Sequence, residues 1–178
     1  KALHIRNGVL NIQFFVEDGV FYAYDPGFRL QGEAPHIHLA HINGFDHRKM
    51  LINFALTGIF GEKDFHVKND YIFKGKTACT MWVLLTEGMI NSIEGLDKIK
   101  ADKDVVFILD RFKTGDTVSK DWLGTERQVF ARIYIVTDTI LEMNSKITEL
   151  KNILKIRDNQ GNNMILTWLE PFDSKKYL

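Results

Sequence analysis

Two runs of alternating apolar and polar residues near the amino terminus predict a β-hairpin. The runs cover residues 10–16 and 20–25, and residues 17–19 between them read Glu-Asp-Gly. A three-residue loop with glycine in the left-handed conformation is a common hairpin connection. Since successive side chains of a strand point to opposite faces, one face is expected to pack into a core. That face carries Leu10, Ile12, Phe14, Val16, Val20, Tyr22 and Tyr24.

Polar side chains gather at the end of this hairpin that is remote from the loop. The expected register makes Gln13 a diagonal neighbour of Asp25, with their backbones about 7–8 Å apart. Pro26 and Gly27 fit the centre of a type II turn, which would bring Arg29 to the same end. Carboxylate and amide oxygens suit Mg²⁺, and the planar guanidinium suits a phosphate or carboxylate. The alternative is a surface hairpin with a solvated Asp–Arg pair, which composition alone favours.

Helical spacing of apolar residues recurs twice further along the chain. Asp46 as an N-cap and Gly58 as a stop predict a helix between them. Its apolar stripe is expected to be core, and it comprises Met50, Leu51, Phe54, Ala55 and Ile59. Thr139 and Glu142 form a capping box that predicts a helix to about residue 154. Strands are predicted at residues 77–85, 89–93, 105–109 and 130–136, and a last hairpin is predicted around residues 159–162.

The division of the chain follows from its glycines and charges. Residues 58–61 are rich in glycine, residues 62–70 are charged, and strand patterns dominate the chain from about residue 71 onward. We therefore expect an α+β chain with two parts, residues 1–64 and 65–178. A length of 178 residues allows one domain or two small ones and can bury a sizeable core.

Three histidines come after the hairpin, namely His36, His38 and His41. On a helix only His38 and His41 share a face, and no carboxylate stands at the spacing that would complete a zinc set. We expect a helix with partly exposed histidines beside the active site. His36 is close to Arg29 in sequence, so a role for His36 in contacting an acidic substrate is an open alternative.

Composition excludes several classes of protein. The 23 basic and 23 acidic residues balance, and nothing indicates a nucleic-acid patch or a polybasic membrane segment. No stretch approaches the apolar length of a membrane span. The single cysteine, Cys79, rules out an intrachain disulfide framework and agrees with a reducing cytoplasm. The first residues are no signal peptide and lack an initiator Met, so we expect a fragment of a longer protein.

Residues 8–32 resemble the metal-binding hairpin of the ATP-grasp ligases, especially carbamoyl phosphate synthetase large subunits and biotin carboxylases. Residues 11–14, Asn-Ile-Gln-Phe, resemble the first strand of that hairpin, with Gln13 in the place of the first metal ligand. Asp25 falls where the family has Glu, and Arg29 falls on the family's Arg. The departure is Gly27, where Asn is usual, so the side-chain ligand of the second metal site is missing.

The second part is similar to the β-rich domain that follows the ATP-grasp fold in biotin carboxylase-like and purine-pathway ligases. Arg132 on a strand, the helix from Thr139 and the turn at residues 158–161 stand in matching order. The resemblance thus implies the carboxyl-terminal part of an ATP-grasp fold, an antiparallel sheet with helices, followed by a β-rich domain with one long helix.

This resemblance also implies a chemistry. Family members use ATP and Mg²⁺, with Mn²⁺ as a substitute, to make an acylphosphate from a small-molecule carboxylate, and an amine then displaces phosphate. Asp25 would be the main metal ligand, Gln13 the second ligand and Arg29 the anion clamp, and all three would contact Mg–ATP. The catalytic residues would be Asp25 and Arg29.

Other expectations accompany this chemistry. The nucleotide lobe of the family lies upstream, so the isolated piece is expected to be inactive. The sequence leaves open whether the protein forms a homodimer. A degenerate ligase that binds a ligand or partner without catalysis is one alternative. An unrelated α+β binding module is the other.

Overall fold

The computed structural model describes residues 8–61, 65–70 and 72–173, and the chain divides into two compact units. These units are Lys1–Lys74 and Gly75–Leu178, whereas the glycine and charge pattern of the sequence predicts a division after residue 64. Helices alternate with antiparallel sheets, so the α+β class is confirmed. None of the helices in the described ranges has the length and apolar character needed to cross a membrane.

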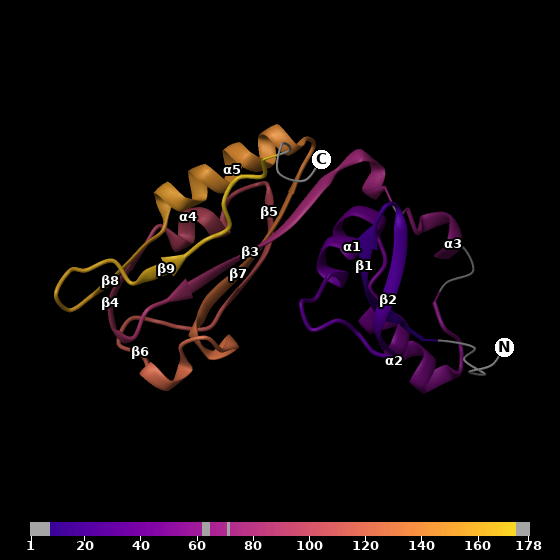
Figure 1. Cartoon of the computed structure of the whole chain (residues 1–178), viewed down its shortest axis with the longest axis horizontal. Helices are drawn as coiled ribbons and strands as arrows, with labels where there is room; N and C mark the ends of the chain where they lie inside the picture. The colour runs from indigo at the N-terminus through magenta and orange to yellow at the C-terminus, as the bar shows by residue number, and fades with distance from the viewer. Residues whose placement is uncertain (1–7, 62–64, 71, 174–178) are drawn as a thin grey trace. The chain divides into compact units, whose positions relative to one another are not determined.

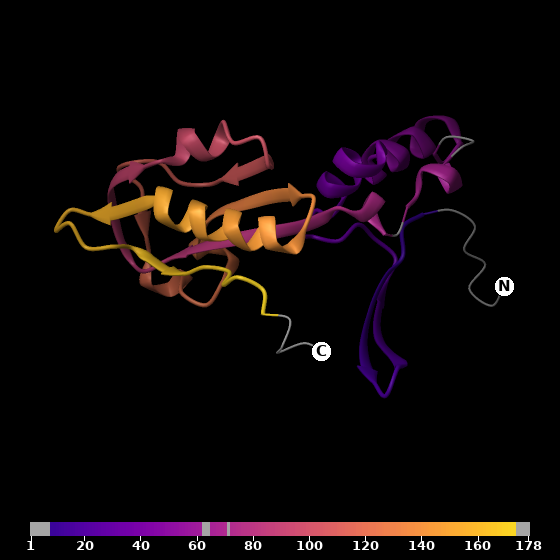
Figure 2. The ribbon, with the colours of Figure 1, turned by 90° about the horizontal axis from the view of Figure 1, so that it is seen from above.

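The described residues of the first unit form a hairpin and three helices. Strands β1 (Asn11–Glu17) and β2 (Val20–Gly27) form the hairpin. The helices are α1 (His36–Asn43), α2 (His47–Thr57) and the single turn α3 (Phe65–Lys68) (Figure 1). Figure 2 shows the hairpin as a long ribbon that projects from the helices of its own unit.

The loop of the hairpin is shorter than predicted. Glu17 pairs with Val20, so the loop contains just Asp18 and Gly19, whose φ angles are 50° and 75°. Two positive φ angles define the type I′ turn, which matches the twist of the flanking strands better than a three-residue loop would. Gly19 is left-handed as expected, but the register that results from a three-residue loop is wrong.

The predicted type II turn after Asp25 is also wrong. Strand β2 continues through Pro26 and Gly27, which pair with Ile12 and Asn11, and the φ angle of Gly27 is not positive. Proline lacks the N–H group of a sheet donor and is tolerated on an edge strand such as this one. The strand pairing therefore overrides the turn preference of the Pro-Gly sequence.

The helix predicted between Asp46 and Gly58 is confirmed together with both of its ends. The Asp46 carboxylate accepts a hydrogen bond from the backbone N–H of Arg48 at 2.8 Å. Gly58 is left-handed, and its N–H donates to the carbonyl oxygen of Phe54 at 2.8 Å. These local bonds explain why the boundaries could be located from the sequence.

The two apolar surfaces expected to form a core in this unit are mostly exposed. Of the α2 stripe, Met50 is buried, Leu51 and Phe54 are half-buried, and Ala55 and Ile59 are exposed. The predicted core face of the hairpin is exposed at every position. The prediction of a core is therefore wrong for these residues as they stand here, because an apolar face is buried only when another element covers it.

The second unit contains two antiparallel sheets. The larger has the order β5 (Val105–Asp110), β7 (Val129–Thr137), β3 (Thr77–Leu85) and β9 (Ile165–Thr167). The smaller has the order β6 (Thr117–Val118), β4 (Gly88–Glu94) and β8 (Lys155–Asp158). Helices α4 (Leu96–Lys100) and α5 (Ile140–Ile153) accompany them, and short 3₁₀ turns lie at Phe73–Gly75, Lys120–Trp122 and Glu126–Gln128.

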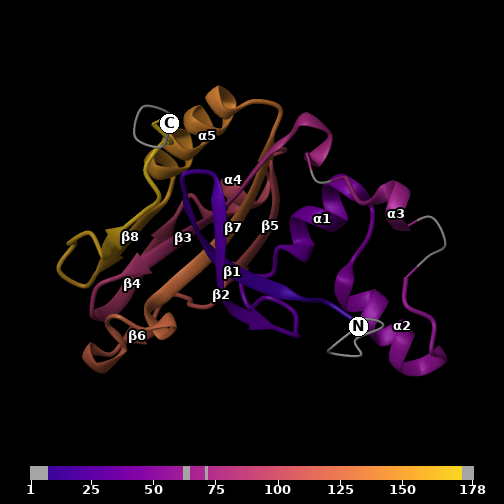
Figure 3. The same cartoon turned by 45° about the vertical axis from the view of Figure 1, so that its right-hand side comes forward.

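The core of this unit lies between the larger sheet and α5, which packs against β3 and β7 (Figure 1 and Figure 3). Every residue of β7 is buried. Helix α5 begins with the predicted capping box, in which both Thr139 and Glu142 make their bonds. It contributes Met143, Ile147 and Leu150 to the core, as its spacing predicts.

The last hairpin is confirmed around residues 159–162: the N–H of Asp158 donates to the carbonyl oxygen of Asn162, and the N–H of Met164 donates to that of Ile156. A bridge between Arg157 and Asn163 joins its two arms, while β8 pairs mainly with β4 and β9 pairs with β3. The turn between them is held by Asp158, whose carboxylate accepts the backbone N–H groups of Gln160 and Asn162 at 2.8 Å each. Period-two patterns identify strands, but they do not identify the partner of each strand.

Candidate functional site

The candidate site lies at the open end of the hairpin, where Gln13 and Asp25 are directly opposite each other. The register expected from the sequence makes them diagonal neighbours, so their cross-strand relation is closer than expected. Residues directly opposite in an antiparallel pair share a face, with Cβ atoms about 4.5–5.5 Å apart. Both side chains are exposed. An amide oxygen and a carboxylate are therefore available together on one side of the ribbon.

A β-bulge produces this arrangement. The register shifts between Gln13 and Phe14, and Tyr24 on the other strand is left without a partner in the ladder. The Tyr24 hydroxyl donates a hydrogen bond to the Gln13 Oε1 atom at 2.7 Å. Bulges often re-aim side chains in this way. The alternating pattern predicts a core-facing Tyr24 and does not predict this contact, because alternation gives no sign of where a bulge will occur.

Arg29 lies just past the end of β2 and is exposed. Its Nη1 atom donates to the carbonyl oxygen of Leu30 at 3.0 Å, and its backbone N–H donates to the carbonyl oxygen of Gly27 at 3.0 Å. Among the ion pairs of the described residues, none joins Arg29 to Asp25. The solvated Asp–Arg pair considered from the sequence is thus not formed, and most of the five guanidinium N–H donors remain for a ligand.

Gly27 lies between these groups, and its backbone does not require glycine. A Cβ atom placed there would lie 3.6 Å from the Arg29 Nε atom and 4.0 Å from the carbonyl oxygen of Asn11, which are ordinary contacts. A larger side chain therefore fits. The absence of a third oxygen ligand at this position results from the residue itself and not from lack of space.

Gln13 and Asp25 can supply two oxygen ligands to Mg²⁺, which is fewer than would enclose the ion. The described residues contain no group of three His, Cys, Asp or Glu side chains that could enclose a metal ion. Mg²⁺ usually keeps several waters and binds through one or two protein groups together with the phosphates of a substrate. Gln13 and Asp25 can supply those two groups, so they could hold Mg²⁺ that arrives with a nucleotide.

The histidines after the hairpin are less exposed than predicted. His36 and His38 on α1 are 6% and 7% exposed, whereas His41 is exposed. Burial lowers the pKa of His36, and the nearby Arg48 guanidinium lowers it further. Helical spacing shows that His36 and His38 point to different sides of the helix. It does not show which sides the rest of the unit covers, so the burial of both residues could not be predicted from the sequence.

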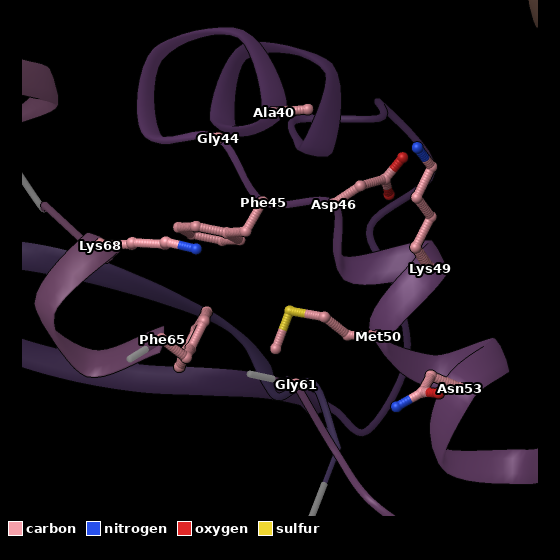
Figure 4. A pocket seen from close by; sticks show the side chains of 10 residues that line it. All are labelled: Ala40, Gly44, Phe45, Asp46, Lys49, Met50, Asn53, Gly61, Phe65 and Lys68. Carbon is pink, nitrogen blue, oxygen red and sulfur yellow. The ribbon is translucent and has the colours of Figure 1, made fainter. Parts of the chain in front are cut away.

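A cavity of the first unit is separate from this hairpin end. It has a volume of about 390 Å³ and lies between α1, α2 and α3. In Figure 4 the side chains of Phe45, Met50 and Phe65 point into the same space, and the two phenyl rings pack edge to face with centroids 4.8 Å apart. None of Gln13, Asp25 and Arg29 lines it.

Arg132 occupies an internal position in the second unit. Its guanidinium lies 4.1 Å from the centroid of the Trp82 ring, and its Nη2 atom donates to Glu126 Oε1 at 2.9 Å. The side chain is almost fully buried. These contacts assign Arg132 a stabilising role within the unit through a cation–π contact and an ion pair.

Sequence comparisons find no relative: no protein-family model and no curated protein matches the chain. Solved structures do match. An L-amino acid ligase from Bacillus licheniformis aligns with a TM-score of 0.69 at 19% identity. A phosphoribosylglycinamide synthetase from Anaerococcus prevotii aligns with a TM-score of 0.67 at 17% identity. Each alignment covers 89% of this chain and 39% of the other, so the chain spans well under half of either structure. The resemblance to ATP-grasp ligases is thus confirmed for the fold.

Proposed function

We propose that this chain is the carboxyl-terminal part of an ATP- and Mg²⁺-dependent ligase that activates a small carboxylate as an acylphosphate and joins it to an amine. The fold shared with two ligases supports this assignment. The observation that carries it is the placement of Gln13 directly opposite Asp25, with Arg29 just beyond the same end of the hairpin.

Each of these residues has a role in the proposal. Asp25 and Gln13 hold Mg²⁺, or Mn²⁺ in its place, and the bound ion neutralises charge on the phosphates of ATP. Tyr24 orients the Gln13 oxygen through its 2.7 Å hydrogen bond. Arg29 binds an anionic oxygen of the substrate or phosphate through its planar fork. Positioning and charge stabilisation then account for catalysis, with little covalent work by the protein.

We also propose that the active protein is longer than this chain. The motivation is the hairpin, which exposes apolar side chains on both faces, among them Phe15 at 66% and Phe21 at 67%. A two-stranded ribbon of this kind is marginal in water by itself. The piece alone should therefore be inactive. The single Cys79 and the balanced charge agree with a cytoplasmic enzyme that acts on small molecules rather than nucleic acid.

The test uses the full-length protein with Mg–ATP, a panel of carboxylates and a panel of amines, and it measures phosphate release and amide formation. Asp25→Asn should lower kcat by about 100-fold or more, because a charged metal ligand is lost. Asp18→Asn is the matched control, since it removes an equal charge from the loop of the same hairpin, where φ is 50° and asparagine is tolerated. Equal activity in both variants would remove Asp25 from the mechanism.

A second candidate function is a degenerate ligase that binds Mg–ATP or a partner without turnover. Gly27, which offers no side-chain ligand, and the short Asp25 side chain favour it. Calorimetry of the full-length protein with Mg–ATP distinguishes the two. Binding that yields no product with any pair in the panel supports the degenerate form.

A further inference from the structure

Residues 168–173 form a strap on the surface of the second unit. They follow β9, belong to no helix or strand, and pass beside α5 (Figure 1). Trp168 packs against the core at the start of the strap. Further along, the strap leaves apolar side chains partly in water, with Leu169 at 41% and Phe172 at 45% exposed. Burial alone therefore does not hold the strap in place beyond Trp168.

Two side chains of α5 hold the strap. The Asn144 Nδ2 atom donates to the carbonyl oxygen of Phe172 at 2.8 Å, and the Phe172 N–H donates to the Asn144 Oδ1 atom at 2.6 Å. Asn144 thus exchanges two hydrogen bonds with one backbone residue, as paired residues of neighbouring strands do. Lys151 Nζ pairs with Glu170 Oε1 at 2.6 Å, but the Glu170 side chain is 76% exposed. Water and salt weaken such an ion pair, so Asn144 is the main attachment.

A cavity of about 380 Å³ lies between the strap, α5 and β3. Cys79 of β3 and Met143 and Ile147 of α5 form part of its wall, and residues 169–173 of the strap form another part. Protein interiors have few voids larger than a water molecule, and side chains that border a void lack contacts on that side. The strap is therefore packed loosely over α5 and β3.

Cys79 can report on the position of the strap. It is the only cysteine of the chain, and it is half-buried in the cavity wall. Burial raises the pKa of the Cys79 thiol to about 11. Thiol reagents react with the thiolate, so Cys79 should react slowly while the strap is closed. Removal of the strap would open one side of the cavity and make the thiolate easier to form.

We propose that residues 168–173 are a strap that opens and closes the cavity between β3 and α5 while the rest of the second unit stays folded. Trp168 is the fixed end of the strap, and Asn144 holds its other end through the backbone of Phe172. Segments with few buried contacts open at a much smaller free energy than a packed core does. The strap thereby controls which molecules reach the apolar wall of the cavity.

The test measures the rate at which N-ethylmaleimide alkylates Cys79 in the 178-residue chain at fixed pH. Asn144→Ala removes both bonds to Phe172 and should raise this rate about ten-fold or more. Asn152→Ala is the matched control, because Asn152 is an exposed asparagine of the same helix, and it should leave the rate unchanged. Alanine favours the helix at both positions, so α5 should stay folded in both variants.

A third variant grades the effect. Asn144→Asp keeps an acceptor for the Phe172 N–H but loses the donor to the Phe172 carbonyl oxygen, so its rate should lie between those of the parent chain and Asn144→Ala. Raised salt should increase the rate modestly in the parent chain and less in Lys151→Met, which lacks the ion pair to Glu170.

Urea distinguishes opening of the strap from unfolding of the unit. Opening exposes little surface, so the alkylation rate should depend weakly on urea, whereas global unfolding depends on it steeply. A urea dependence as steep as that of global unfolding would overturn the proposal. Equal rates in Asn144→Ala and Asn152→Ala would do the same. Alkylation of the parent chain as fast as that of the urea-unfolded chain would show that the strap does not close the cavity.

Discussion

Tyr24 shows how a single residue shapes the candidate site. The bulge leaves it without a cross-strand partner, and its hydroxyl instead bonds to Gln13. Asp25 then lies directly opposite Gln13. Gly27, two residues further on, has space for a side chain that would point toward Arg29. The chemistry available at this end of the hairpin therefore depends on a few side chains that can be changed one at a time.

Gly27→Asn should strengthen Mg–ATP binding in the full-length protein. The new amide adds an oxygen donor near Asp25, and a gain of about 1 kcal/mol would tighten the Kd about five-fold. Gly27→Ala fits the same space without adding an oxygen and should leave the Kd unchanged. Isothermal titration calorimetry measures both. If alanine tightened binding as much as asparagine, backbone stiffening and not a new ligand would be responsible.

Asp46 gives a prediction about pH. Hydrogen bonds from the Arg48 side chain hold the pKa of Asp46 at about 2, below its ordinary value of 3.8. A carboxyl group whose pKa is lower in the folded state stabilises the fold above its unfolded pKa. This stabilisation should be lost as the pH falls from about 4 to about 2. Urea midpoints of the full chain, followed by NMR signals of α2, should fall across this window.

Asp46→Asn is the control for that measurement, because asparagine keeps an N-cap acceptor and has no charge to titrate. The α2 midpoint of this variant should change less between pH 4 and pH 2. An unchanged slope in the variant would show that other carboxyl groups account for the acid sensitivity.

Among the elements, α5 and the hairpin represent opposite cases. Helix α5 has a complete capping box and buries Met143, Ile147 and Leu150 in the core of its own unit. The hairpin has strong strand patterns but no cover within the described structure, although its rings stack on one another, with Phe15 and Tyr24 centroids 4.7 Å apart. The spacing of apolar residues is equally clear in both elements, yet only α5 has its apolar face buried.

Thr139→Ala should destabilise the second unit by about 1 kcal/mol, which lowers Tm by about 4 °C, because the capping bond to the Glu142 N–H is lost. Thr148→Ala on the exposed side of the same helix should be nearly neutral, since its hydroxyl bonds only to the Asn144 carbonyl within the helix. Thermal unfolding followed by circular dichroism compares them. Equal losses would mean that the cap contributes nothing special.

At the scale of the whole molecule, the two units differ in how completely they are packed. The second unit has a continuous core, whereas the first exposes apolar surface on its hairpin and on α2. The chain spans 39% of the L-amino acid ligase and of the phosphoribosylglycinamide synthetase with which it aligns. This difference in packing is what one expects if further polypeptide completes the first unit.

Hydrogen exchange on the isolated chain tests this expectation. Amides of β3 and β7 should exchange slowly, through global unfolding of their unit, and those of β1 and β2 should exchange several orders of magnitude faster, because few buried contacts protect them. In the full-length protein the hairpin amides should become protected. Equally slow exchange of the hairpin in the dilute isolated chain would contradict the idea that it lacks a partner.

Features that depend on neighbours along the chain follow from the amino-acid sequence. It located strand β3, the ends of α2 at Asp46 and Gly58, and the capping box of α5, because each rests on bonds or alternation within a few residues. The tertiary structure alone decided the bulge that sets Gln13 against Asp25, the partners of β8 and β9, and the burial of His36. These features depend on which distant segments meet, and local spacing carries no record of that.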